Sequence, residues 1–264
     1  MNKTILITGG TGTVGSKLVE HFFYKKYNVI FTTKNDDEIT KLIKKINIKN
    51  YNKPSPKLRL TNNKILGISI DLTKNKSYEI ILKFIEKNNL YPNYLINCAR
   101  SLSYLKVNID GFTRRPEWLG EFTLDVIVPY ELSIKLTDQK NSKLKSIINI
   151  SSIYGIVPPN PSIYKNPKIE SPIQYGVSKA AQIHLTKELA IRLSNKNIQV
   201  NSISFGGIKG RANKNFIKKY SKLCPLKRML EQDEVIGSID FLVSTNSSNI
   251  TGHNLVVDGG WTVW

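Results

Sequence analysis

The sequence predicts an α/β fold in a single domain. Short apolar segments typical of buried strands alternate along the chain with segments that carry the apolar spacing of helices. The first apolar segment runs directly into a glycine-rich turn, an arrangement typical of nucleotide-binding units. The 264 residues show no break in composition, no linker and no internal repeat. We therefore expect one domain, residues 1–264, with one large core.

The composition argues against several classes of protein. Cys98 and Cys224 lie far apart, and the three histidines are scattered, so we expect no metal site. No signal peptide precedes the first apolar segment, which together with the few cysteines indicates a cytoplasmic location. No apolar stretch approaches the roughly 20 residues that span a bilayer, so we expect no membrane segment.

The chain is strongly basic, because 39 Lys and Arg residues stand against 20 Asp and Glu residues and give a net charge of +19. Such a charge raises nucleic acid as a partner. The excess is nearly all lysine and is spread from one end to the other, without an arginine-rich block or a zinc-finger, RRM or KH signature. We therefore expect no specific nucleic-acid binding. The alternative of a nucleic-acid binder predicts an affinity that falls steeply with salt.

The glycine-rich turn lies between a predicted strand, residues 4–8, and a predicted helix that includes residues 17–26. Residues 9–15 (GGTGTVG) bring four glycines into this turn. Glycines let the backbone approach a pyrophosphate, whose negative charge is favoured at a helix N-terminus. The pattern predicts the first half of a dinucleotide-binding unit, and a tight turn without a ligand is the alternative.

The second predicted strand, residues 28–33, bears on the choice of cofactor. It ends at Thr33, where dinucleotide-binding proteins usually carry an acid that binds the ribose of NAD. Lys34 follows directly, and a cation favours the 2′-phosphate of NADP. We therefore expect NADP to be preferred, with NAD possible because Asp36, Asp37 and Glu38 come just after.

Two further strands, residues 65–70 and 93–99, end in candidate ligand contacts. Ligands of open α/β sheets bind at the carboxyl ends of strands, so both ends point to the cofactor. The residues at these two ends are Asp71, Leu72, Asn97, Cys98 and Ala99. We interpret Cys98 as a small buried hydrophobe and not as a nucleophile. Helices are predicted at residues 77–88 and 121–137, the second kinked at Pro129.

The fifth strand, residues 145–151, brings Ser151 and Ser152 to the same edge of the sheet. A long segment rich in Pro, Tyr and Asn, residues 153–174, follows and is typical of a functional loop. A predicted helix then opens with Tyr175 and Lys179, which share a face at a spacing of four. A positive charge beside a phenol favours phenolate, so Tyr175 can act as an acid/base near neutral pH. In so lysine-rich a chain, the alternative is that Tyr175 and Lys179 are ordinary surface residues on an amphipathic helix.

The remaining segments complete the alternation. The pattern predicts a sixth strand at residues 198–204, a basic, loop-like segment at 208–230 that ends in a helical turn, a helix at 231–245 and a last strand at 254–260.

Six motifs in this order resemble the short-chain dehydrogenase/reductase family over essentially the full chain. They are TGGTGTVG, the strand end Asp71–Leu72, INCA, INISS, Tyr175-xxx-Lys179 and ITGHNLVVDGG. The glycine spacing, the insertion before Tyr175 and the ending DGGWTVW resemble one subgroup found in bacterial surface-polysaccharide and flagellin-glycan biosynthesis. The resemblance implies a Rossmann fold, a doubly wound parallel sheet of about seven strands with helices on both faces.

The resemblance also implies roles for single residues. Tyr175 would be the acid/base, Lys179 would promote its ionisation and bind the nicotinamide ribose, and Ser152 would hold the substrate oxygen. The implied cofactor contacts are Gly9, Thr11, Gly12 and Val14 at the pyrophosphate, Asp71 and Leu72 at the adenine, Asn97 and Ala99 on the ribose side, and Gly206 and Ile208 at the nicotinamide. Relatives are commonly homo-tetramers or homo-dimers, so the resemblance implies self-association.

Three positions depart from the family pattern. Asp125 stands where the family usually carries a helix asparagine, seven residues after a Trp such as Trp118. Phe205 replaces the usual proline after the sixth strand, and Gly210 lies where a threonine is usual. We expect an NAD(P)-dependent oxidoreductase acting on a hydroxyl or carbonyl of a sugar or similarly polar small molecule, with Asp125 near the chemistry. The alternative is a dinucleotide-binding sensor or scaffold with impaired catalysis.

Overall fold

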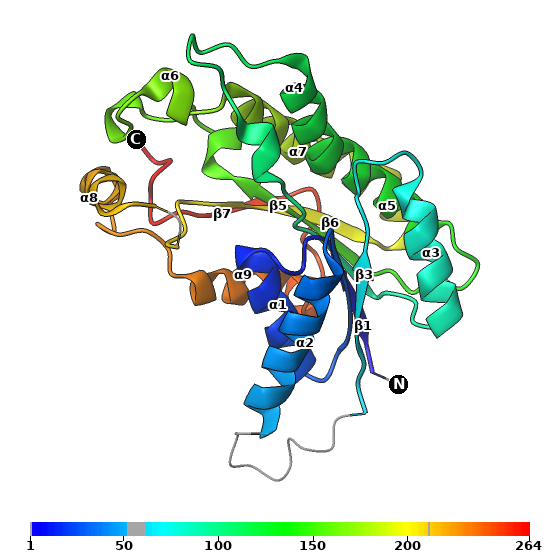
Figure 1. Ribbon diagram of the computed structural model, residues 1–264. Coiled ribbons are helices and arrows are strands. Elements are labelled where there is room, and N and C mark those ends of the chain that lie inside the picture. The colour runs from blue at the N-terminus through cyan, green and yellow to red at the C-terminus, as the bar shows by residue number, and fades with distance from the viewer. Residues whose placement is uncertain (1, 52–61, 211) are drawn as a thin grey trace.

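Seven strands form one sheet with helices on both faces (Figure 1). The computed structural model describes residues 2–51, 62–210 and 212–264. The strands follow the order β3-β2-β1-β4-β5-β6-β7, and neighbouring strands are parallel throughout. They are β1 (Thr4–Ile7), β2 (Asn28–Thr33), β3 (Ile65–Ser69), β4 (Tyr94–Asn97), β5 (Ser146–Ser152), β6 (Gln199–Phe205) and β7 (Asn254–Val257). The expected seven-stranded Rossmann sheet is confirmed.

Helices cover both faces of this sheet. They are α1 (Thr13–Tyr24), α2 (Asp36–Tyr51), α3 (Ser77–Asn88), α4 (Arg115–Phe122), α5 (Val128–Thr137), α6 (Pro167–Glu170), α7 (Ile173–Arg192), α8 (Lys214–Leu223) and α9 (Val235–Leu242). Because side chains alternate along a strand, Ile5 and Ile7 of β1 pack with α1, α2 and α9. Leu6 between them packs with α3, α5 and α7 on the other face. Figure 1 shows these helix layers above and below the strands.

The order of strands creates a crevice at one end of the sheet. From β1 the chain winds outward to β2 and β3, and from β4 it winds the other way to β7. Ligands of such sheets bind beyond the carboxyl ends of the strands at this reversal. The glycine turn follows β1 and residues 98–100 follow β4 at that point, so the fold positions a site there.

Two elements differ from the sequence prediction. The predicted helix 121–137 begins earlier, at Arg115, and its irregularity is a π-helical turn, Thr123–Ile127, between α4 and α5. Pro129 lies in the first turn of α5, directly after this π-helical turn. Residues 208–230, predicted to be loop-like, contain α8, which Asn213 caps by accepting a hydrogen bond from the Phe216 amide at 2.9 Å.

Candidate active site

A pocket of about 670 Å³ lies at the carboxyl ends of the strands. Its wall combines the glycine turn, the ends of five strands, the start of α7 and part of the 208–230 segment. The sequence-predicted site residues in this wall are Gly9, Thr11, Gly12, Val14, Lys34, Leu72, Ala99, Ser152, Tyr175, Lys179, Gly206 and Ile208. Residues from distant parts of the sequence are therefore brought to one cavity.

Three predicted site residues lie outside the wall. Asp71 lies beside it, 3.1 Å from the Lys34 ammonium. Asn97 is buried and donates to the Asn149 side chain at 2.8 Å, so its amide joins β4 to β5 and does not reach into the pocket. Asp125 is buried behind Lys179.

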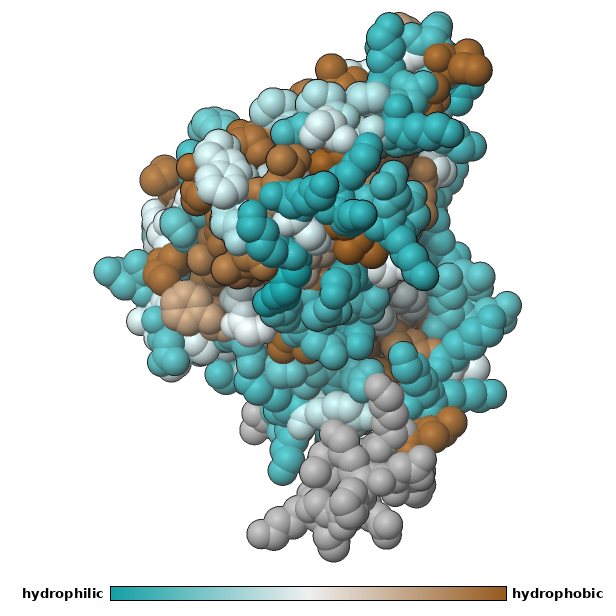
Figure 2. All heavy atoms as spheres, turned by 90° about the vertical axis from the view of Figure 1, so that its left-hand side faces the viewer, coloured by the Kyte–Doolittle hydropathy of each residue, from teal (hydrophilic) through white to brown (hydrophobic). Residues whose placement is uncertain are grey.

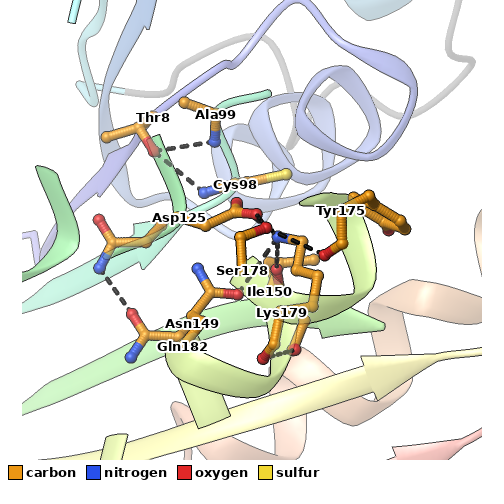
Figure 3. A network of polar contacts seen from close by, with 12 residues as sticks. Thr8, Cys98, Ala99, Asp125, Asn149, Ile150, Tyr175, Ser178, Lys179 and Gln182 are labelled. Atoms are coloured by element: carbon orange, nitrogen blue, oxygen red, sulfur yellow. Dashed lines mark hydrogen bonds and ion pairs between the residues drawn. The ribbon is translucent and has the colours of Figure 1, made fainter. Parts of the chain in front are cut away.

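The glycine turn forms a close-fitting cradle. Thr8 holds it against β4 by accepting hydrogen bonds from the amides of Cys98 at 3.0 Å and Ala99 at 3.1 Å (Figure 3). Gly9 has a φ of +67°, and a Cβ there would come within 2.7 Å of the Ala99 Cα. The N-cap residue of α1 is Gly12, which has no side chain, so backbone groups line the pocket at this helix N-terminus. This cradle fits the pyrophosphate of a dinucleotide.

Charged groups at the outer end of the pocket form two linked sets. Lys34 pairs with Asp71; burial opposes ionisation of Asp71, but hydrogen bonds from Thr73 and the charge of Lys34 outweigh it and keep its pKa below the usual value. The Glu38 carboxylate accepts hydrogen bonds from Thr11 at 2.5 Å and Thr33 at 2.9 Å, which lower its pKa. Sequence reasoning did not assign Glu38 to the site, because only the fold brings it beside the glycine turn.

The inner end of the pocket is lined by Ser152, Tyr175 and Lys179. Ser152 is the last residue of β5, and its hydroxyl accepts a hydrogen bond from the Tyr154 amide at 3.2 Å. Tyr175 lies in the first turn of α7, with the Lys179 ammonium 5.9 Å from the centre of its ring. The Arg100 guanidinium lies 4.3 Å from the same ring centre. The spacing of four thus places a phenol and an ammonium in one cavity.

Lys179 is buried, and its ammonium donates three hydrogen bonds (Figure 3). Its ammonium donates to Asp125 Oδ1 at 2.7 Å, to the Ile150 carbonyl at 2.8 Å and to Gln182 Oε1 at 3.2 Å. An ammonium has three N–H donors, so these three acceptors use all of them. Ser178 donates to the other Asp125 oxygen at 2.8 Å. Asp125 comes from the π-helical turn and forms a direct ion pair with the lysine.

Two groups near this pair have raised pKa values, the buried Glu121 and the half-buried Cys98 of the pocket wall. Glu121 is 1% exposed, and both of its carboxyl oxygens lack a partner among the described residues. Burial, and after it the charge of Asp125, raise the pKa of Glu121 to about 7. Burial also raises the pKa of the Cys98 thiol to about 11, which leaves almost no thiolate at neutral pH. Cys98 is therefore not poised as a nucleophile.

The two segments predicted to shape the substrate pocket share one apolar cluster. Ile153 and Ile163 from the first segment pack with Tyr220 and Met229 from the second and with Trp261 near the C-terminus. The rings of Tyr220 and Trp261 are stacked, with centroids 4.2 Å apart. Residue 211 of the second segment lies outside the described residues. The cluster links both segments into one wall beside Tyr175.

The structure gives physical reasons for two of the departures from the family pattern. Phe205 is buried in the core beneath the sheet, where its ring packs with α9 residues such as Val235. Gly210 has a φ of +144°, which L side chains rarely adopt, and a Cβ there would come within 2.7 Å of the Gln232 amide. A threonine at position 210 would therefore need a different backbone.

Among residues 2–51, 62–210 and 212–264, no group of three or more His, Cys, Asp or Glu side chains gathers at metal-binding distance. Over the same ranges, no helix combines the length and apolar character that a bilayer crossing requires.

Comparisons with known proteins agree with this geometry. A family model described as enoyl-(acyl carrier protein) reductase matches residues 13–262. The chain is 30% identical to the post-translational flagellin modification protein A of Campylobacter coli, over 98% of both chains. It is 38% identical over 133 residues to the D-arabinitol 2-dehydrogenase [ribulose-forming] of Scheffersomyces stipitis, which is 47% of this chain and 45% of that one.

A solved structure is also similar over the full length. The short-chain dehydrogenase of Leptospira borgpetersenii serovar Hardjo-bovis with bound NAD+ superposes with a TM-score of 0.81 at 30% identity, covering 99% of this chain and 93% of that one. The chain belongs to the short-chain dehydrogenase/reductase family of oxidoreductases.

Proposed function

We propose that this protein transfers a hydride between a nicotinamide dinucleotide and a hydroxyl or carbonyl carbon of a polar small molecule. The observation that carries the proposal is that one pocket is lined both by Ser152, Tyr175 and Lys179 and by the glycine cradle. The dinucleotide supplies the hydride acceptor or donor when bound. Every other part of the chemistry falls to side chains of this chain.

Tyr175 is the proton-transferring group. In the oxidation direction its phenolate takes the proton of the substrate hydroxyl as the hydride leaves the same carbon, and reduction reverses both transfers. Ser152 has its hydroxyl hydrogen available, because its oxygen accepts from the Tyr154 amide, so it can donate to the substrate oxygen. Together they hold the reacting oxygen.

Lys179 is already fully hydrogen-bonded, which limits how it can bind the nicotinamide ribose. Binding the nicotinamide ribose requires it to exchange one of its three present acceptors. The bond to Gln182, at 3.2 Å, is the longest of the three and the one most readily given up. Asp125 neutralises the lysine charge, so the closest unpaired cation to the Tyr175 ring among the described residues is Arg100, at 4.3 Å from its centre.

A sugar or other polyol is the substrate class that we propose. The relatives named above include a D-arabinitol 2-dehydrogenase and a flagellin modification protein. The wall around Tyr175 carries hydroxyl groups that suit such a substrate, from Ser152, Tyr154 and Tyr164. A role in surface-polysaccharide or flagellin-glycan synthesis and a cytoplasmic location remain expectations from the sequence.

Self-association as a dimer or tetramer also remains a proposal. Its support is a set of exposed apolar side chains on the edge strand β7 and the C-terminus: Val256, Val263 and Trp264. On the face that carries α8 and the C-terminus, apolar side chains gather in patches between hydrophilic ones (Figure 2).

The test measures reduced-nicotinamide absorbance over a panel of alcohols, ketones, polyols and sugars with NAD(H) and NADP(H). Turnover that disappears in Tyr175→Phe while dinucleotide binding persists is the expected result. No turnover on any substrate, with binding intact and biological activity unchanged in Tyr175→Phe, would instead favour a sensor or scaffold. From the sequence, Lys34 suggests NADP as the preferred dinucleotide, and the binding arms of this test measure that preference directly.

A further inference from the structure

We propose that Glu38 accepts hydrogen bonds from the adenosine ribose and thereby favours the binding of NAD over that of NADP. The inference rests on the proposed dinucleotide function and names the residue that decides which dinucleotide is used. Glu38 lies in the first turn of α2, five residues beyond Thr33, and its side chain lines the pocket. The position that usually carries the ribose-binding acid, at the end of β2, holds Thr33.

Glu38 is held in place by the two elements that flank the ribose site. Thr11 of the glycine turn and Thr33 of β2 both donate to its Oε2. No hydrogen bond from the described residues reaches Oε1, so this oxygen is available to a ligand. Although Glu38 is exposed, its carboxylate is therefore tethered between the cradle and the second strand, where the adenosine ribose of a dinucleotide lies.

The ionisation of Glu38 gives this position its selectivity. The hydrogen bonds from the two threonines lower its pKa, so it is a carboxylate at neutral pH. A carboxylate only accepts hydrogen bonds, so it pairs with the 2′- and 3′-hydroxyls of NAD. The 2′-phosphate of NADP is also only an acceptor when ionised and carries a charge of the same sign, so it is repelled.

The neighbouring cation does not cancel this effect. The Lys34 ammonium lies 3.1 Å from Asp71, so its charge is already paired. Lys41, on the next turn of α2, is exposed, and its effect in lowering the Glu38 pKa ranks behind those of both threonines. The Glu38 carboxylate thus lines the pocket beside a lysine that is already paired, which favours the uncharged 2′-hydroxyl.

The test is direct titration of the full chain with NAD and with NADP, by calorimetry, without substrate or turnover. We expect the native chain to bind NAD about tenfold or more tightly than NADP, a difference of about 1.4 kcal/mol. Glu38→Gln keeps the shape of the side chain and removes its charge, so it should bring the two dissociation constants within about threefold of each other. Asp37→Asn removes the same charge from the same turn and should leave the ratio unchanged, because Asp37 does not line the pocket.

Three outcomes would overturn the inference. Tighter binding of NADP by the native chain would show that the positive charge of Lys34 outweighs the negative charge of Glu38. An unchanged ratio in Glu38→Gln, or an equal change in Asp37→Asn, would show that Glu38 does not read the ribose. Failure to bind either dinucleotide would instead remove the proposed function itself, and the two failures are thus distinguishable.

Discussion

The two ends of the pocket hold their charges in opposite ways. At the inner end, the Lys179 side chain is 6% exposed and is paired with Asp125, which is 2% exposed. At the outer end, the Lys34 side chain is 49% exposed and its partner Asp71 is 34% exposed. Burial makes the inner pair costly to break, whereas water screens the outer one. The inner charges are therefore tied to folding and chemistry, and the outer ones to the choice of ligand.

The largest effect expected at the inner end is on turnover. Tyr175→Phe removes the proton-transferring hydroxyl, so kcat should fall by about 10²- to 10⁴-fold. Dissociation constants for the dinucleotide should change little. Tyr130→Phe, on the exposed face of α5, is the matched control and should keep full activity. Steady-state kinetics with parallel binding titrations check both, and retained turnover in Tyr175→Phe would contradict the assignment.

The next largest expected difference between the two ends of the pocket is in the free energy of unfolding of variants that lack one partner of the ion pair. Asp125→Ala leaves the Lys179 ammonium buried without its counter-charge, so the free energy of unfolding should fall by about 3–5 kcal/mol. Asp71→Ala removes the partner of a half-exposed lysine and should cost about 0–1 kcal/mol. Denaturant titration measures both variants. Equal losses would mean that burial does not distinguish the two pairs.

The buried Glu121 predicts a pH dependence of stability. Its pKa is about 7 in the folded protein, against an ordinary value of 4.5. As pH rises between these values, the unfolded chain ionises at this position and the folded one does not, so this group reduces stability, by about 3 kcal/mol above pH 7. Glu121→Gln should therefore become more stable relative to the native chain as pH rises from 4 to 8. Glu79→Gln, at an exposed site on α3, should show no such trend.

A smaller effect concerns the pH profile of alcohol oxidation. Asp125→Asn removes a negative charge beside Lys179 and leaves more of the lysine charge to favour the Tyr175 phenolate. The acid limb of the profile should move to lower pH. Cofactor affinity should stay nearly unchanged. An unmoved limb, with chemistry shown to be rate-limiting, would mean that the ion pair is purely structural.

The smallest effect belongs to Lys34 at the outer end. Lys34→Asp should weaken NADP binding and improve NAD relative to it, but by less than the change in Glu38→Gln, because Lys34 is already paired with Asp71. The same titrations measure it. Equal effects on both dinucleotides would show that Lys34 does not face the 2′-phosphate.

Local patterns were sufficient to predict the strand ends and the glycine turn. The alternation of strands and helices around that turn predicted the α/β fold, whereas the seven-stranded sheet and the roles of Ser152, Tyr175 and Lys179 followed from the family resemblance. Glu38 was not predicted, because its position depends on Thr11, 27 residues away, and on Thr33. The π-helical turn was also missed, since one extra residue in a turn leaves little trace in apolar spacing.

The helix α8 was missed although the sequence carried its signals. Asn213 is a preferred N-cap residue, and Phe216, Ile217 and Tyr220 have the spacing of one helical face. The many lysines around them made the segment resemble a solvated loop. A capping residue ahead of an apolar face would have been the better guide in this basic stretch.

The stacking of Trp261 on Tyr220 gives the protein its own optical reporter. Trp261 is 6% exposed, Trp264 is 76% exposed, and Trp118 is half-buried on α4 away from the pocket wall. Tyr220 lines the pocket and accepts a hydrogen bond from the Gly207 amide at 2.9 Å. A ligand that shifts either substrate segment therefore changes the surroundings of a single indole. With Trp264 replaced by Phe, indole emission can rank candidate substrates by occupancy alone, before any of them is turned over.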